Sequence, residues 1–145
     1  MLTPEDAPQV ANRPLSITCE VEAKTAHGVL VAHGGSAVGY ALYLKDGRMI
    51  FAVHATGQAT ASITSKEIPS GRFTAEARLA ADGSMTLALN GQVAATGKAE
   101  GLLARQPQEN FCVGHDDGVP VTTYADGKPF QGVIEKLQVT VGTKN

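Results

Sequence analysis

The segment GHDDGVPV, from Gly114 to Val121, holds the residue types closest to chemistry: His115, Asp116 and Asp117. Carboxylates beside an imidazole can bind a metal ion or move a proton. An EF-hand calcium loop needs oxygen ligands at alternating positions and a distant bidentate glutamate, and this segment has neither. Two adjacent carboxylates on an extended strand also point to opposite faces, so they would not converge on one ion.

The glycines and the Val-Pro-Val that flank the two acids favour a shaped turn at a rim of the domain. In such a turn an aspartate accepts local backbone N–H bonds and glycines adopt positive φ. Asp116 is the residue best suited to fix it. If the loop curls, Asp116 and backbone carbonyls could instead hold Ca²⁺, and this alternative stays open. No other metal or cofactor is predicted.

No set of residues suggests a nucleophile with its base. The histidines stand near the ends of expected strands, no GxSxG motif accompanies them, and we expect them to be solvated: His27, His33, His54 and His115. Glu20 and Glu22 share a strand face and could form a glycosidase acid pair. Because the ExDxxE arrangement of sandwich-fold glucanases is absent, an ordinary solvated face explains them better. We therefore expect no catalysis from this chain alone.

Aromatic side chains, which stack on sugars, are few: tryptophan is absent and there are three tyrosines. Tyr40 is expected in the core. Tyr43 points to the other side of its strand and is the better candidate for a ligand-binding surface. Tyr124 follows the GHDDG segment and joins its histidine and aspartates as a candidate for contacts at the rim.

The chain has 145 residues and a formal net charge of -2, with basic and acidic residues interspersed. No basic stripe exists to follow a phosphate backbone, so nucleic acid is not an expected partner. No apolar run approaches the roughly 18 residues of a membrane span. Residues 1–10 lack a basic segment followed by an apolar one, so the compartment is unknown; it would be periplasmic or secreted if a parent protein carries a signal peptide.

Cys19 and Cys112 are the two cysteines, and neither has the CxxC or Cys/His spacing of a zinc site. Both lie within strand-like runs, where lone cysteines act as small hydrophobic residues. A bridge between them stays open.

Period-two alternation dominates the chain and predicts an all-β protein. Leu15, Ile17, Cys19 and Val21 alternate with polar residues, and similar runs follow to about residue 89. The dipeptides that separate these runs favour hairpin turns with positive φ: Asp46-Gly47, Asp82-Gly83 and Asn90-Gly91. Thr74–Ala81 is rich in helix formers, but its period of two predicts a strand.

Many short strands separated by turns predict an antiparallel two-sheet β-sandwich of the jelly-roll type. Long connections are expected at 56–65 and 97–110, where the chain would cross between sheets. The apolar pattern of 132–141 changes parity, which predicts a β-bulge near Glu135-Lys136. Residues 1–12 read as a lead-in, 13–142 as one domain and 143–145 as a tail.

Three ordered stretches carry a resemblance: NRPLSITCEVE from Asn12, GVLVAHGG from Gly28 and GYALYLKDG from Gly39. A fourth runs from Phe111 through Gly114, Asp116, Gly118 and Pro120-Val121 to the final strand. Together they resemble the C-terminal β-sandwich domain, concanavalin A-like and laminin-G-like, of bacterial arylsulfatases. Cys112 and His115 stand where that family usually carries acids.

The resemblance implies a noncatalytic accessory domain that packs on a sulfatase catalytic domain or on another subunit. The sulfatase motif C/S-x-P-x-R surrounds neither cysteine here. A parent arylsulfatase is therefore expected to supply the activity, and its substrate is not indicated. The alternative is a lectin-like module that binds sulfated glycans.

Overall fold

The computed structural model describes residues 10–11, 13–24, 28–34, 38–55, 60–99, 101–103, 107, 111–113 and 132–142. Strands and turns make up these residues, and no helix among them has the length and apolarity to cross a membrane. The strands are β1 (Leu15–Ala23), β2 (Gly28–Gly34), β3 (Gly39–Lys45), β4 (Arg48–His54), β5 (Ala61–Glu67), β6 (Arg72–Leu79), β7 (Ser84–Leu89), β8 (Gln92–Lys98), β9 (Phe111–Val113) and β10 (Gly132–Val141).

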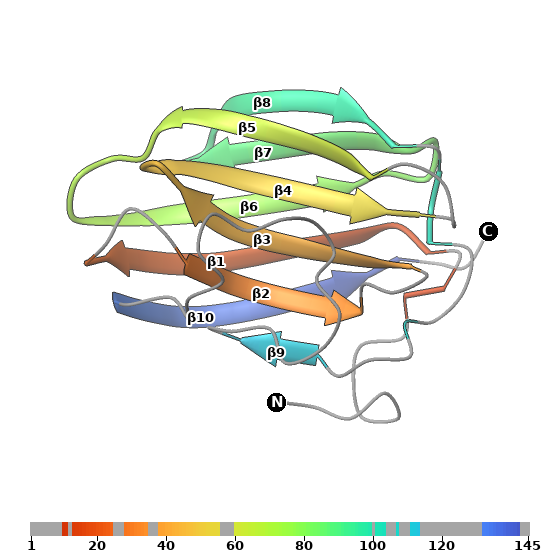
Figure 1. Cartoon of the computed structure of the whole chain (residues 1–145), viewed down its shortest axis with the longest axis horizontal. Coiled ribbons are helices and arrows are strands. Elements are labelled where there is room, and N and C mark those ends of the chain that lie inside the picture. The colour runs from red at the N-terminus through yellow and green to blue at the C-terminus, as the bar shows by residue number, and fades with distance from the viewer. Residues whose placement is uncertain are drawn as a thin grey trace.

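The strands form two five-stranded antiparallel sheets that pack face to face (Figure 1). The β1 sheet has the order β10-β1-β6-β7-β8, and the β3 sheet has the order β5-β4-β3-β2-β9. Contacts of β5 with β7 and β8 close the sandwich along one side. The predicted antiparallel sandwich is therefore confirmed.

The β1 sheet alternates as the sequence predicted. Its inward side chains on β1 are at most 2% exposed: Leu15, Ile17, Cys19 and Val21. The predicted strand within Thr74–Ala81 is β6, which ends at Leu79. Its alanines alternate inward against β1, so the pairing register overrides their helix propensity.

The central strands of the β3 sheet, β3 and β4, are buried on both faces. Along β3 every residue from Gly39 to Leu44 is buried, and along β4 the same holds from Met49 to Val53. Inward side chains such as Leu42 and Phe51 join the main core, which both sheets share. The opposite face carries a second buried cluster: Val29, Ala32, Ala41, Tyr43, Ile50 and Ala52.

Two of the three expected turns have positive φ at both central residues. These φ values are 53° and 74° at Asp46-Gly47 and 51° and 79° at Asn90-Gly91, as a two-residue type I′ hairpin requires. At the third, only Gly83 has positive φ, so the expectation is wrong for Asp82. The loop is longer there, because Ala80 donates its N–H to the Ser84 carbonyl and Gly83 donates to the Ala80 carbonyl.

The expected connection at 56–65 is wrong, since β5 begins at Ala61. The strand was missed because Ser65, a polar residue, occupies an inward position. It is 2% exposed, and its hydroxyl accepts the Met49 N–H at 2.9 Å and donates to the Lys66 carbonyl at 2.6 Å. The hydroxyl is thus satisfied within the sheet. The connection expected from 97 likewise begins later, because β8 continues to Lys98.

The predicted β-bulge is confirmed. The pairing of β1 with β10 passes from Thr18↔Gln138 to Glu20↔Glu135, and Lys136 has a φ of 53°. The extra residue restores the inward set at the end of the strand. Val10, within the expected lead-in, is 0% exposed and packs in the main core.

Candidate functional site

Four of the residues selected from the sequence lie outside the described part of the chain: His115, Asp116, Asp117 and Tyr124. The rim turn and its calcium alternative therefore stay predictions. Among the residues that the structure does describe, no three His, Cys, Asp or Glu side chains gather as metal ligands would.

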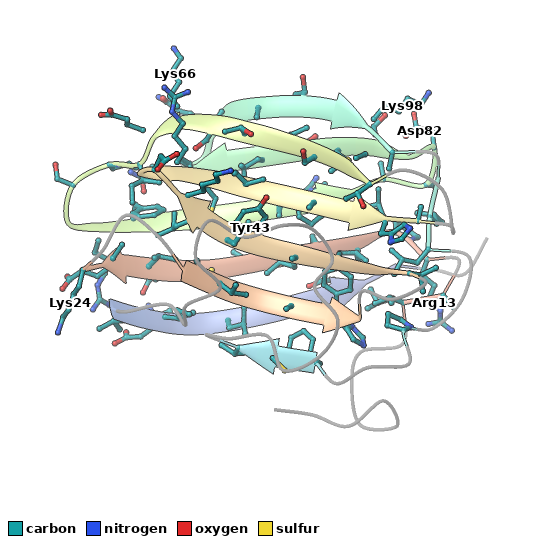
Figure 2. The ribbon with its side chains drawn as sticks, in the orientation of Figure 1. Arg13, Lys24, Tyr43, Lys66, Asp82 and Lys98 are labelled. Atoms are coloured by element: carbon teal, nitrogen blue, oxygen red, sulfur yellow. The ribbon has the colours of Figure 1, made fainter. Side chains whose placement is uncertain are left out.

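The prediction that Tyr43 presents a binding surface is wrong. Its side chain does leave the main core, but the residue is only 4% exposed and belongs to the second apolar cluster. The cross-strand neighbours of Tyr43 are Val29 on β2 and Ile50 on β4, and both are apolar. Figure 2 shows Tyr43 in the middle of the sheet, away from either end of the sandwich.

The prediction that the histidines are solvated is wrong for His33, which is 0% exposed. His33 Nδ1 lies 2.9 Å from the Tyr40 hydroxyl, and the imidazole also meets the Phe111 ring edge-on at 5.4 Å. Tyr40 is in the core as expected, and burial raises the pKa of its phenol. His54 is half-buried, whereas His27 and His115 are outside the described residues.

The two cysteines are free and buried, so the bridge that the sequence left open does not form. They belong to different sheets, Cys19 to β1 and Cys112 to β9. Burial raises the pKa of the Cys19 thiol to about 11. A thiol of that pKa is neutral at physiological pH and a poor nucleophile.

Of the candidate acid pair Glu20 and Glu22, Glu20 is engaged in ion pairs. Glu20 lies 3.7 Å from Arg72 and 3.6 Å from Lys136, and Arg72 also contacts Glu135 at 2.9 Å. The hydrogen bond to Glu135, with the charge of that carboxylate, raises the pKa of Arg72. These exposed ion pairs match the solvated strand face that the sequence favoured.

A groove of about 280 Å³ crosses the outer face of the β1 sheet. Its lining is mostly polar: Thr18, Thr74, Glu76, Arg78, Thr86, Ala88, Gly91 and Val93. We call it the polar groove. All of them except Gly91, which lies in the β7–β8 turn, come from β1, β6, β7 and β8, so antiparallel pairing fixes their spacing. The groove offers three hydroxyls, a carboxylate and a guanidinium from a rigid sheet.

Local contacts hold the polar groove in shape. Arg78 lies 3.3 Å from Glu76 on the same strand, which orients both groups along the sheet. The Asn90 side chain accepts the Thr74 N–H at 3.0 Å, and the Asn90 N–H donates to the Thr74 carbonyl at 2.8 Å. The β7–β8 turn is therefore tied to β6 at one end of the groove.

Two further hollows lie at opposite ends of the sandwich. The end pocket, of about 420 Å³, is lined by Ala23, Lys24, Gly47, Glu67, Ile68, Pro69, Ser70 and Gly71. It lies where β1 ends, beside the β3–β4 turn and the β5–β6 loop. The apolar groove, of about 310 Å³, is lined by Pro14, Leu15, Ser16, Arg78, Leu79, Ala80, Ala81, Thr140 and Gly142.

Sequence reasoning missed all three hollows. The threonines and charges of the polar groove were assigned to a solvated face, because each is ordinary at an outward strand position. The available signal was their recurrence on consecutive paired runs, with Thr18 on one and Thr74 and Glu76 on another. The polar groove became visible only once the order of the strands was known.

Solved structures with the same fold include lectin-type and laminin domains. Mouse laminin α1 domains LG4-5 align with a TM-score of 0.75 and 18% identity over 97% of this chain and 38% of that one. The CBM40 of Ruminococcus gnavus IT-sialidase, bound to α2,3 sialyllactose, aligns with a TM-score of 0.69 and 19% identity over 89% and 76%. A Limulus polyphemus SAP-like pentraxin gives 0.60 and 17% over 90% and 65%.

At these identities the structural likeness shows the fold alone, and the chain spans well under half of the laminin fragment. No curated protein matches the sequence. The family model of the concanavalin A-like lectin/glucanases, a laminin G type, does match, over residues 3–142. Since that match takes in both sheets and the polar groove, the chain belongs to the concanavalin A-like lectin/glucanase superfamily.

Proposed function

We propose that this chain is a noncatalytic, lectin-type accessory module that binds a saccharide in the polar groove. The observation that carries the proposal is the groove itself, with hydroxyl, carboxylate and guanidinium groups on the three paired strands β1, β6 and β7. The superfamily and the sugar-bound CBM40 neighbour support it as analogies of fold. Among the described residues, the acids beside the groove are engaged in ion pairs rather than arranged for hydrolysis.

Sugar hydroxyls are both donors and acceptors, and the groove can meet both needs. Glu76 accepts, Arg78 donates, and the hydroxyls of Thr18, Thr74 and Thr86 do either. No aromatic ring lines the groove, so a sugar would gain hydrogen bonds without stacking. We therefore expect weak binding whose specificity comes from the pattern of hydroxyls.

The test is a titration followed by amide chemical shifts, with lactose and other neutral oligosaccharides as probes. The double variant Thr74→Ala/Thr86→Ala should weaken binding by about two- to tenfold per hydroxyl. The matched control is Ser62→Ala/Thr64→Ala, which removes two exposed hydroxyls from β5 on the other sheet. An equal loss in both variants, or no shifts at groove residues with any probe, would contradict the proposal.

A second role, packing on a catalytic domain of the arylsulfatase type or on another subunit, is favoured by the apolar groove. That groove includes Pro14 and Gly142, which lie near the two ends of the folded region and are joined by a hydrogen bond of 2.8 Å. A domain attached to either end of the sandwich would thus meet an apolar surface. Such surfaces mark interaction sites more often than isolated exposed residues do.

The expectation that this chain is part of an arylsulfatase can be tested from the gene and by an activity assay. We expect the reading frame upstream of this segment to encode a C/S-x-P-x-R motif, and the isolated chain to leave p-nitrophenyl sulfate unhydrolysed. Turnover by the pure chain would contradict both proposed roles. An upstream frame without the motif would remove the arylsulfatase parent and leave the saccharide site untouched.

A further inference from the structure

One end of the polar groove is apolar. Its lining there consists of Ala88 on β7, Val93 on β8 and Gly91 in the turn between them. Val93 is 65% exposed, and within the described part of the chain the only other exposed large apolar side chain is that of Val113. The groove therefore combines hydrogen-bonding groups over β1, β6 and β7 with an exposed apolar end over β7 and β8.

The pairing register sets the polar and apolar groups in one row across four strands. Thr18 on β1 lies opposite Glu76 on β6, and Glu76 lies opposite Ala88 on β7. Ala88 lies in turn opposite Val93 on β8. Residues directly opposite each other on antiparallel strands have Cβ atoms about 4.5–5.5 Å apart. A hydroxyl and a carboxylate are thus followed, one strand spacing at a time, by a methyl and an isopropyl group.

A β-bulge in β8 keeps Val93 on the outer face. Val93 lies opposite Ala88, whereas Thr96 lies opposite Thr86, and the register of β7 with β8 shifts between these two pairs. Strict alternation would put Val93 and Thr96, three positions apart, on opposite faces of the sheet. The extra residue of the bulge lets both side chains face outward. The pairing of the strands therefore brings Val93 to the groove.

The space beside Val93 is open to a ligand. Gly91 has a φ of 79°, and a Cβ placed on it would meet no atom within 4 Å. The hydrogen bonds between Asn90 and Thr74 hold this turn against β6. A ligand group can therefore lie next to Val93 without a clash with the turn.

Glu76, next to the apolar end, is able to accept a hydrogen bond from a ligand. Arg78 donates from Nη2 to Glu76 Oε1 at 3.3 Å, and the Glu76 side chain is 38% exposed. A carboxylate accepts hydrogen bonds at both of its oxygens, so the ion pair leaves acceptor capacity. An amide N–H, which only donates, is a matched partner for this acceptor.

We propose that the polar groove prefers saccharides that carry an acetamido group, as N-acetylhexosamines do. The acetamido N–H donates to Glu76, and the acetyl methyl packs on Ala88 and Val93, which follow Glu76 in the same row. The donor of the substituent thus meets the carboxylate, and its methyl meets the apolar end. This inference rests on the proposed saccharide-binding function and names the class of sugar that the groove selects.

Two matched pairs of disaccharides test the inference on the whole chain: N-acetyllactosamine against lactose, and N,N′-diacetylchitobiose against cellobiose. Within each pair the sugars differ only in acetamido groups that replace hydroxyls. In titrations followed by amide chemical shifts, the acetylated sugar of at least one pair should bind about four- to tenfold more tightly, because a buried methyl and a hydrogen bond to a charged acceptor both contribute. In saturation-transfer NMR its acetyl methyl should receive more saturation than its ring protons.

The readout for variants is the ratio of the two affinities within a pair, because a general change in the groove alters both members. Val93→Thr keeps the branched shape but replaces a methyl with a hydroxyl, and it should lower the ratio by about two- to fourfold. Glu76→Gln should also lower it, since a neutral amide oxygen is a weaker acceptor than a carboxylate. The matched control is Val113→Thr on β9 of the β3 sheet, which should leave the ratio unchanged.

Affinity ratios close to one in both pairs would overturn the inference and leave the saccharide site standing. A wild-type ratio in both Val93→Thr and Glu76→Gln, or an equal fall in Val113→Thr, would also overturn it. If none of the four disaccharides binds at the groove, both this inference and the proposed function are contradicted. Thermal melting of Val93→Thr should match that of wild type because the position is exposed, so a lowered ratio reports on binding.

Discussion

The two sheets use the same strand geometry but differ in their outer faces. On the β1 sheet the outward positions are polar, as at Thr18, Thr74 and Thr86, and they line a groove. On the β3 sheet the outward positions of the central strands are apolar and buried, as at Ala41 and Ala52, each 0% exposed. The β1 sheet thus presents a polar outer face, whereas the central strands of the β3 sheet present a packed apolar one.

This difference separates stability from recognition. Substitutions on the outer face of the β3 sheet disturb a packed apolar cluster, so their cost falls on folding. Substitutions on the outer face of the β1 sheet change solvated groups, so their cost to folding should be small, and under the proposed function they weaken saccharide binding. The contrast predicts which variants lower the free energy of unfolding and which leave it nearly unchanged.

The largest difference in unfolding free energy should appear between two variants that each place an aspartate on one outer face. Ala52→Asp buries a carboxylate in the second apolar cluster and should cost at least about 3 kcal/mol of unfolding free energy. Thr86→Asp, at a half-buried outward position on β7, should cost within about 1 kcal/mol. Urea unfolding of both proteins measures this; similar losses would erase the distinction between the sheets.

The inner faces should respond alike, because they share one core. Leu42 on β3 and Leu87 on β7 are both 0% exposed and both belong to the main cluster. Truncation of either leucine to alanine should cost roughly 2–5 kcal/mol. Denaturant midpoints of the two variants provide the comparison, and a near-neutral Leu87→Ala would show that the β1 sheet is loosely attached.

A smaller effect is expected from Tyr40→Phe, which removes the hydroxyl that contacts His33 Nδ1 at 2.9 Å in the β3 half of the core. The ring and its packing remain, so the loss should be about 1–2 kcal/mol. Thermal unfolding of the variant beside wild type measures it. No change in stability would mean that this buried contact contributes nothing to the rigidity of the β3 sheet.

The smallest effect concerns an exposed turn of the β1 sheet. Asp82 Oδ1 accepts the Ser84 N–H at 2.9 Å, and this hydrogen bond lowers the pKa of the carboxyl. Because the pKa of this carboxyl is lower in the folded protein, it contributes stability above its pKa in the unfolded chain, about 3.9. That contribution is lost as the pH falls through its pKa in the folded protein. Asp82→Asn should therefore reduce the loss of stability at acid pH. Thermal melting of the variant and of wild type at a series of pH values from neutral to acid measures this.

Alternation and turn chemistry were sufficient to predict most of the β1 sheet. Leu15 to Val21 revealed the inward face of β1, and the parity change near Lys136 revealed the bulge, since each follows from local geometry alone. The predictions were wrong where a hydrogen-bond partner on another strand allowed a polar side chain to be buried. Ser65 hid β5 because its inward hydroxyl is satisfied by the backbone N–H of Met49, a partner on another strand.

The candidate sites divide in the same way. The order of residue types along the chain identified the concanavalin A-like, laminin-G-like sandwich, and the family match agrees with it. The link to arylsulfatases stays a prediction. Tyr43 and His33 were misplaced because exposure depends on what packs across the sheet, and both are buried. The polar groove combines residues of four strands and does not follow from any one of them.

What the sequence alone determined is the set of paired, twofold-alternating strands and most of their turns, since side-chain period and positive φ are properties of a few neighbouring residues. Only the tertiary structure decided which outward faces stay in contact with water and which residues of separate strands line one groove. Thr18, Thr74 and Thr86 lie far apart in the chain and share one outer face because the sheet order places β1, β6 and β7 side by side.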